Sequence, residues 1–85
     1  MRRFGIVTAI NPMRRMVALS SEEGYTIIEL LTYFDLEVGD EIFWDSGIEL
    51  GMQRFCNLTK GSSNEVYVQS HGVQESQLRK QLLLP

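Results

Sequence analysis

Short runs of apolar and β-branched residues recur along the first 70 residues, and turn-forming residues separate them. Runs of this kind, bounded by Gly, Pro, Asn, Asp and Ser, are typical of β-strands joined by tight turns. Their regular spacing favours a small closed barrel, since closure removes the exposed strand edges of a free meander. The pattern predicts six strands, at residues 4–10, 14–20, 25–32, 40–44, 52–58 and 65–70.

The first three segments are expected to form an antiparallel meander. Pro12 interrupts the first, because proline cannot donate a ladder hydrogen bond, and Gly24 completes the turn after the second. Residues 25–32 could also form a helix, since Glu29 and the leucines after it are good helix formers. The β-branched residues of this segment favour a strand instead: Thr26, Ile27, Ile28 and Thr32.

A turn at Gly39–Asp40 divides the chain into two halves, and the fourth strand follows it directly. Glycine adopts backbone angles there that other residues resist. Phe43 and Trp44 are adjacent in that strand and point to opposite faces, so one of them is less buried. We expect Trp44 to be the core residue, and we expect Phe4 and Tyr67 to pack in the barrel or against the tail.

The tail changes to a helix-like composition. Residues 73–84 are rich in Gln, Glu, Leu, Arg and Lys, which favour a helix. Leu78 and Leu82 lie one turn apart and are expected to cover the barrel end. The predicted fold is therefore mostly β: a five- to six-stranded antiparallel barrel over residues 1–70, OB-like or alternatively SH3-like, with a C-terminal α-helix.

The composition fits one globular domain over residues 1–85, with 44% hydrophobic and 22% charged residues. No apolar run approaches the roughly 18 residues that span a bilayer, so we expect no membrane association. The basic N-terminus starts like a signal peptide, but Thr8, Asn11 and Pro12 interrupt its apolar stretch. One cysteine cannot form an internal disulfide, which fits a reducing compartment. We expect a cytoplasmic protein.

Motifs of catalysis are missing from the sequence. One histidine and one cysteine cannot by themselves assemble a zinc site, and there is no Gly-rich phosphate loop. Asp40 and Glu41 are neighbours on opposite faces, so they do not form a carboxylate pair for acid–base chemistry. We expect no cofactor and no enzymatic activity, and we expect His71 to serve a turn or a helix cap.

Charge is distributed unevenly along the chain. Residues 1–15 hold four arginines and no acid, and residues 16–50 hold nine carboxylates and no lysine or arginine. Residues 51–85 hold four basic and two acidic residues, which brings the net charge to −3. A negative total repels a polyanion at long range, whereas a local basic patch can still attract one.

Three features of the first half resemble OB-fold RNA-binding modules. They are Gly5-Ile6-Val7 in the first strand, the Glu-Glu-Gly turn at 22–24, and the hydrophobic-Gly-Asp-x-hydrophobic turn at 38–42. Cold-shock domains and the RNA-binding repeats of a large ribosomal protein share this rhythm. The resemblance implies an OB barrel that binds single-stranded nucleic acid. Cold-shock domains carry clustered aromatic residues in strands two and three, and residues 14–20 contain none.

Such binding needs cations along the nucleic-acid backbone and aromatic faces for the bases. Arg14 and Arg15 lie near the first turn, whereas Arg2 and Arg3 lie roughly 20 Å away, at about 3.3 Å per residue. The first pair could instead be solvated or bound to local carboxylates. The predicted nucleic-acid-binding residues are Arg14, Arg15, Arg54 and Lys60 as cations and Tyr25 and Phe55 as stacking faces, with Tyr33 as a further candidate.

A protein-interaction or self-association module is the alternative. The carboxylates of residues 16–50 could face a basic partner, or could only keep the domain soluble. If the tail helix does not dock, Leu78 and Leu82 form an apolar stripe for another protein or a second copy. The sequence thus predicts a non-enzymatic binding module, with weak binding of single-stranded RNA or DNA as the leading hypothesis.

Overall fold

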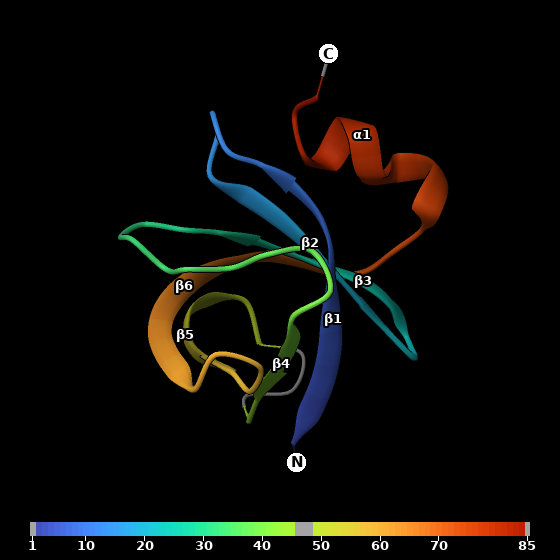
Figure 1. Cartoon of the computed structure of the whole chain (residues 1–85). Helices are drawn as coiled ribbons and strands as arrows, with labels where there is room; N and C mark the ends of the chain where they lie inside the picture. Colours follow the sequence, from blue (N-terminus) through green and yellow to red (C-terminus); the bar gives the residue numbers. More distant parts are fainter. Residues whose placement is uncertain (1, 46–48, 85) are drawn as a thin grey trace.

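Six antiparallel strands close into a barrel, and a short helix packs against its outer surface (Figure 1). The structure is a computed structural model and describes residues 2–45 and 49–84. The strand order is β1-β2-β3-β6-β5-β4, so two meanders are joined by the β3–β6 and β1–β4 pairs. The predicted small antiparallel barrel with a C-terminal helix is confirmed. The elements are β1 (Arg3–Asn11), β2 (Met16–Ser21), β3 (Gly24–Glu29), β4 (Glu41–Trp44), β5 (Gly51–Asn57), β6 (Ser62–Val73), a 3-10 turn (Glu75–Gln77) and α1 (Leu78–Gln81).

The last strand is longer and the helix shorter than predicted. β6 continues past residue 70 to Val73, because its final residues pair with β3, where Val73 lies opposite Tyr25 and Ser70 opposite Ile27. Backbone groups that pair in a ladder cannot also join a helix. The helix predicted over residues 73–84 therefore forms only at 78–81.

The third strand ends earlier than predicted, at Glu29 instead of residue 32. The next amide, that of Leu30, donates its hydrogen bond to the carbonyl oxygen of Arg15 at 2.8 Å, at the first turn. The predicted loop over residues 45–51 lies partly outside the described residues.

Alternate residues of all six strands fill the barrel interior. Trp44 is 1% exposed, and its ring stacks on that of Phe55 with the centroids 4.5 Å apart. Its neighbour Phe43 lies on the other face and is partly exposed, so the prediction for this pair is confirmed. The interior core consists of Val7, Val17, Leu19, Ile28, Phe34, Leu36, Ile42, Trp44, Phe55, Val66 and Val68.

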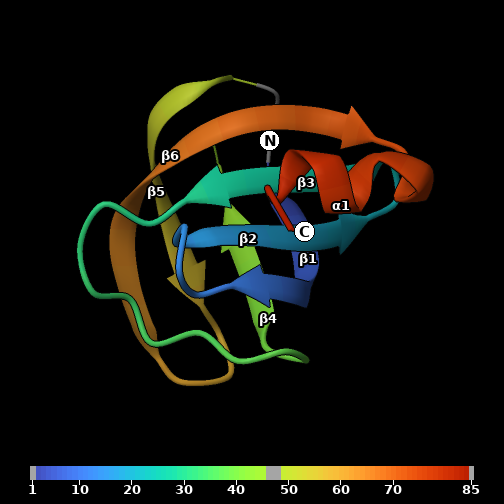
Figure 2. The same cartoon turned by 90° about the horizontal axis from the view of Figure 1, so that it is seen from above.

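A second, smaller core lies between the outer face of β2–β3 and the C-terminal segment. Met16, Ala18 and Ile27 point outward there and are covered by Leu82, which is fully buried. Figure 2 shows α1 lying across these strands. The carbonyl oxygen of Leu82 also accepts a hydrogen bond from Asn11 Nδ2 at 2.8 Å. The helix therefore docks on the barrel, but on its side wall and not over the end.

The turn at Gly39–Asp40 closes the barrel against β1. Gly39 has φ +100°, which disfavours residues with a side chain, and its amide donates to the Val7 carbonyl oxygen at 2.8 Å. The buried Asp40 carboxylate accepts hydrogen bonds from the Glu37 amide at 3.0 Å and from Asn57 Nδ2 at 2.8 Å. These bonds tie the β3–β4 loop to β1 and β5.

Phe4 and Tyr67 lie on the outer surface and belong to neither core, so the prediction that they pack in the barrel or against the tail is wrong. They are 57% and 40% exposed. Strand alternation places Gly5 inside β1 and Val66 and Val68 inside β6, so their neighbours point outward.

His71 lies within β6, at the end of the barrel opposite the β1–β2 turn, and not in a turn or cap as predicted. Its Nδ1 shares a 2.8 Å hydrogen bond with the Thr26 hydroxyl, and its Nε2 lies 3.4 Å from the Glu49 carbonyl oxygen. Burial lowers the pKa of His71 below 6.5, and the nearby Arg3 charge lowers it further, against the opposing effects of Glu49 and Glu23.

We expect the protein to lose stability as the pH falls below about 6.5, where an unfolded histidine takes up a proton that folded His71 resists. The unfolded state then binds more protons, which favours unfolding; above that pH both states are neutral. Urea unfolding followed by circular dichroism between about pH 7.5 and 5.5 measures the loss. His71→Gln should lose less over the same interval, and an equal loss in both proteins would contradict this role.

Candidate nucleic-acid interface

The β1–β2 turn presents Arg14 and Arg15 at one end of the barrel (Figure 1). Arg15 has φ +56°, a left-handed conformation that its carbonyl bond to the Leu30 amide holds in place. Both arginines are exposed. Within residues 2–45 and 49–84, neither side chain forms an ion pair or hydrogen bond, so both guanidinium groups are open to an external anion.

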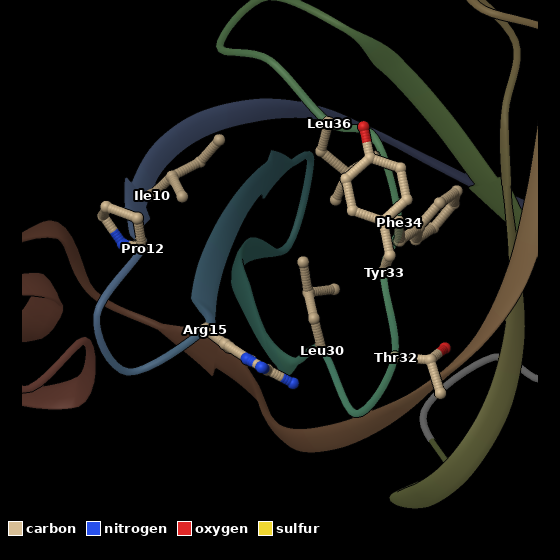
Figure 3. A pocket seen from close by; sticks show the side chains of 8 residues that line it. All are labelled: Ile10, Pro12, Arg15, Leu30, Thr32, Tyr33, Phe34 and Leu36. Carbon is tan, nitrogen blue, oxygen red and sulfur yellow. The ribbon is translucent and has the colours of Figure 1, made fainter.

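Arg15 borders an apolar hollow of about 290 Å³. Figure 3 shows its guanidinium reaching past Leu30, with the ring of Tyr33 on the other side of the hollow. Phe34 and Leu36 are nearly buried and form the floor, which is continuous with the barrel core. The hollow is lined by Ile10, Pro12, Arg15, Leu30, Thr32, Tyr33, Phe34 and Leu36.

Tyr33 offers an aromatic face on a fixed backbone. Its side chain is 84% exposed. Asn64 Nδ2, in β6, donates to the Tyr33 carbonyl oxygen at 2.8 Å and contacts Thr32 Oγ1 at 2.9 Å. The ring is therefore exposed while its main chain is anchored, which lowers the entropy lost when a flat ligand stacks on it.

A second hollow, of about 470 Å³, lies on the other side of Arg15. It is more polar than the first. The Glu29 carboxylate at its border accepts a hydrogen bond from Gln69 Nε2 at 2.9 Å. The second hollow is lined by Met13, Arg14, Arg15, Met16, Glu29, Gln69, Gln81 and Leu83.

Lys60 was predicted to bind nucleic acid, but its ammonium group is held by the β3–β4 loop. Nζ lies 3.0 Å from Asp35 Oδ1, 2.6 Å from Glu37 Oε1 and 3.6 Å from Asp40 Oδ2. Three carboxylates around one ammonium leave no net positive charge to attract a phosphate. We therefore correct that prediction: Lys60 fastens the loop.

The pKa directions agree with this fastening. The hydrogen bond to Glu37 raises the pKa of Lys60 most. Together with Asp35 and Asp40, it outweighs the effect of desolvation, which lowers the pKa. Burial alone would raise the pKa of Asp40, but the hydrogen bonds from Asn57 and from the Glu37 amide, with the Lys60 charge, leave it below 3.8. Both groups therefore remain charged at neutral pH.

The other residues predicted to bind nucleic acid do not lie beside Arg14 and Arg15 at the β1–β2 turn. Phe55 is fully buried on Trp44, so the prediction that it stacks bases is wrong. Tyr25 is partly buried against the second core. Arg54 lies opposite Glu65 and donates to Ser63 Oγ at 3.2 Å on the outer face of β5–β6.

The leucine stripe is not available as a partner surface. Leu82 is fully buried and Leu78 packs partly against the same core. The prediction that Leu82 binds a partner is therefore wrong, because the outer face of β2–β3 already occupies it.

The sequence indicates both arginines and Tyr33 as candidates, but it does not predict that Arg15 and Tyr33 border one hollow. Tyr33 follows a stretch that was predicted to be strand through residue 32, and no local pattern placed it beside the first turn. The sequence indicates Pro12 only as a strand breaker, yet Pro12 also lines the hollow.

Searches against protein-family models, curated proteins and solved structures found no match to this chain. Among the described residues, no helix has the length and apolar character needed to cross a membrane. In the same part of the chain, no three His, Cys, Asp or Glu side chains are grouped so as to hold a metal ion.

Proposed function

We propose that this protein is a non-enzymatic OB-like module that binds single-stranded RNA or DNA across the β1–β2 turn. The observation that carries the proposal is an apolar hollow bordered by Arg15 and by the exposed, anchored Tyr33, with Arg14 next in the chain. Among the described residues, neither arginine side chain has a hydrogen-bond or ion-pair partner. Cations for the phosphates and an aromatic face for a base, close together on one surface, are what the binding of a single strand requires.

The positions of the charges support a nucleic-acid strand that crosses the β1–β2 turn. Arg15 borders both hollows and Arg14 borders the second, so a phosphate at the arginines would leave one neighbouring base over each hollow. The Glu29 carboxylate near the second hollow is already bonded to Gln69. Because the whole chain carries −3, attraction is local and the binding is weak and salt-sensitive.

The first hollow supports stacking of one base. It is lined mainly by apolar side chains, and Tyr33 rises at its rim. Stacking on an aromatic ring contributes roughly 1–3 kcal/mol per base and tolerates any base. The proposed ligand is therefore a single strand of mixed sequence.

We expect Arg14→Ala with Arg15→Ala to weaken binding and to lower the salt dependence. Each phosphate contact on a single strand contributes about −0.7 to the slope of log K against log salt, so losing two should flatten it by about 1.4. Fluorescence anisotropy with labelled single-stranded RNA and DNA at about 50 to 200 mM salt measures both effects. Tyr33→Ala should weaken binding roughly tenfold with an unchanged slope.

The matched control is Arg2→Gln with Arg54→Gln, which also removes two positive charges, but from surfaces away from the β1–β2 turn. We expect this variant to bind more tightly than Arg14→Ala with Arg15→Ala. The proposal fails if the wild type does not bind at about 50 mM salt, or if both double variants weaken binding equally.

A further inference from the structure

The outer face of β1, β4 and β5 is apolar and lies uncovered. It is a side wall different from the β2–β3 wall on which α1 docks. Two rows cross it in register, and we call them together the β1–β4–β5 face. The first row is Phe4, Phe43 and Cys56, and the second is Ile6, Glu41 and Leu58.

The apolar side chains of this face are large and exposed. Phe4 is 57%, Ile6 41% and Leu58 50% exposed, and the rings of Phe4 and Phe43 lie 6.2 Å apart. Contiguous aromatic and aliphatic patches of this kind on a soluble domain mark interaction sites. All six strands have both neighbours in the barrel, so a partner must meet these side chains and cannot add a strand.

Opposite charges stand at the two ends of this face. The Arg2 guanidinium lies 4.5 Å from the centre of the Phe43 ring and 3.3 Å from an exposed Asp45 oxygen. Glu41 borders Ile6, and within residues 2–45 and 49–84 its carboxylate forms no ion pair. Ile6, which lies opposite Glu41, is four residues from Arg2, or about 13 Å at about 3.3 Å per residue along β1, so Arg2 and Glu41 do not pair within one chain.

We propose that the β1–β4–β5 face binds a second copy of this chain in a two-fold symmetric dimer. Rotation by 180° brings the Arg2 end of one face over the Glu41 end of the other and places the two Phe4–Ile6 patches together. An isologous interface requires this kind of self-complementarity. A nucleic-acid strand fits the face less well, because Glu41 lies among the apolar residues and repels phosphates.

Sedimentation velocity of the full chain over about 10 μM to 1 mM tests for the dimer. We expect the wild type to shift from monomer to dimer over this range, and Phe4→Asp to remain monomeric. Met13→Asp is the matched control, since Met13 is 92% exposed at the other end of the barrel and should leave the dimer unchanged. Circular dichroism confirms that each variant is folded.

Charge reversal tests the arrangement itself. Arg2→Glu and Glu41→Arg should each weaken dimerisation about tenfold, because each places like charges together. The two changes combined restore the Arg–Glu pairs across the two-fold axis and should return the dissociation constant to within about threefold of the wild type.

Three results would overturn the proposal: a wild type that stays monomeric at about 1 mM, a dimer that persists in Phe4→Asp, or a combined reversal that does not recover. Binding of single-stranded RNA that is lost in Phe4→Asp, but kept in Arg14→Ala with Arg15→Ala, would assign the face to nucleic acid instead.

Discussion

Replacing Trp44 by alanine is expected to lower the free energy of unfolding by about 3–5 kcal/mol. The indole is 1% exposed, stacks on Phe55 and also lies 6.3 Å from the His71 ring. Its ring packs over Gly5, where an added Cβ would stand 3.4 Å from the Trp44 ring. Removing it leaves a cavity that its neighbours cannot fill without moving the β1 backbone.

The loss should be large relative to the whole stability, since a domain of this length holds about 4–13 kcal/mol at 0.05–0.15 kcal/mol per residue. Urea unfolding followed by circular dichroism measures it without depending on tryptophan fluorescence. Phe43→Ala provides the comparison, because Phe43 is adjacent but points outward, and we expect it to cost about 1 kcal/mol. Equal losses would show that the two sides of β4 are assigned wrongly.

Leu82→Ala is expected to cost about 2–5 kcal/mol. Leu82 is fully buried over Met16, Ala18 and Ile27, and it is the one fully buried side chain of the described C-terminal segment, residues 74–84. Its truncation therefore opens a cavity and weakens the attachment of α1 to the barrel. The Asn11 bond to the Leu82 carbonyl does not involve the side chain and should persist.

The neighbouring residue gives a matched control. Leu83 is 56% exposed, and Leu83→Ala should change stability by no more than about 0.5 kcal/mol. The same urea titrations measure both variants. If the two truncations cost the same, α1 is not held through Leu82.

Much of the strand pattern could be predicted from the sequence, because strands and turns depend on local preferences. Apolar alternation and turn residues located all six strands to within a few residues, and adjacency alone placed Phe43 and Trp44 on opposite faces. Alternation does not say which face is inside, so it cannot tell that Phe55 is buried and Phe4 exposed.

The candidate site was predicted only in part. The basic, acid-free N-terminal stretch of the sequence indicates Arg14 and Arg15 as candidate cations. That Arg15 and Tyr33 border one hollow depends on where β3 ends and on the Asn64 bonds from β6, which join residues 31 and 32 positions apart. No local signal carries such contacts. The same holds for Lys60, whose three carboxylates come from a loop 20 to 25 residues earlier.

By itself, the sequence determined a mostly β fold and the approximate places of its strands, because both follow from periodicity and turn chemistry over a few residues. Only the tertiary structure decided how the barrel closes, that β2 is buried on both faces, and which charges remain open. These depend on pairings between distant segments: β3 with β6, β1 with β4, and Leu82 with the outer wall of β2–β3. Arg15 and Lys60 look alike in the sequence, but among the described residues folding brings carboxylate partners only to Lys60.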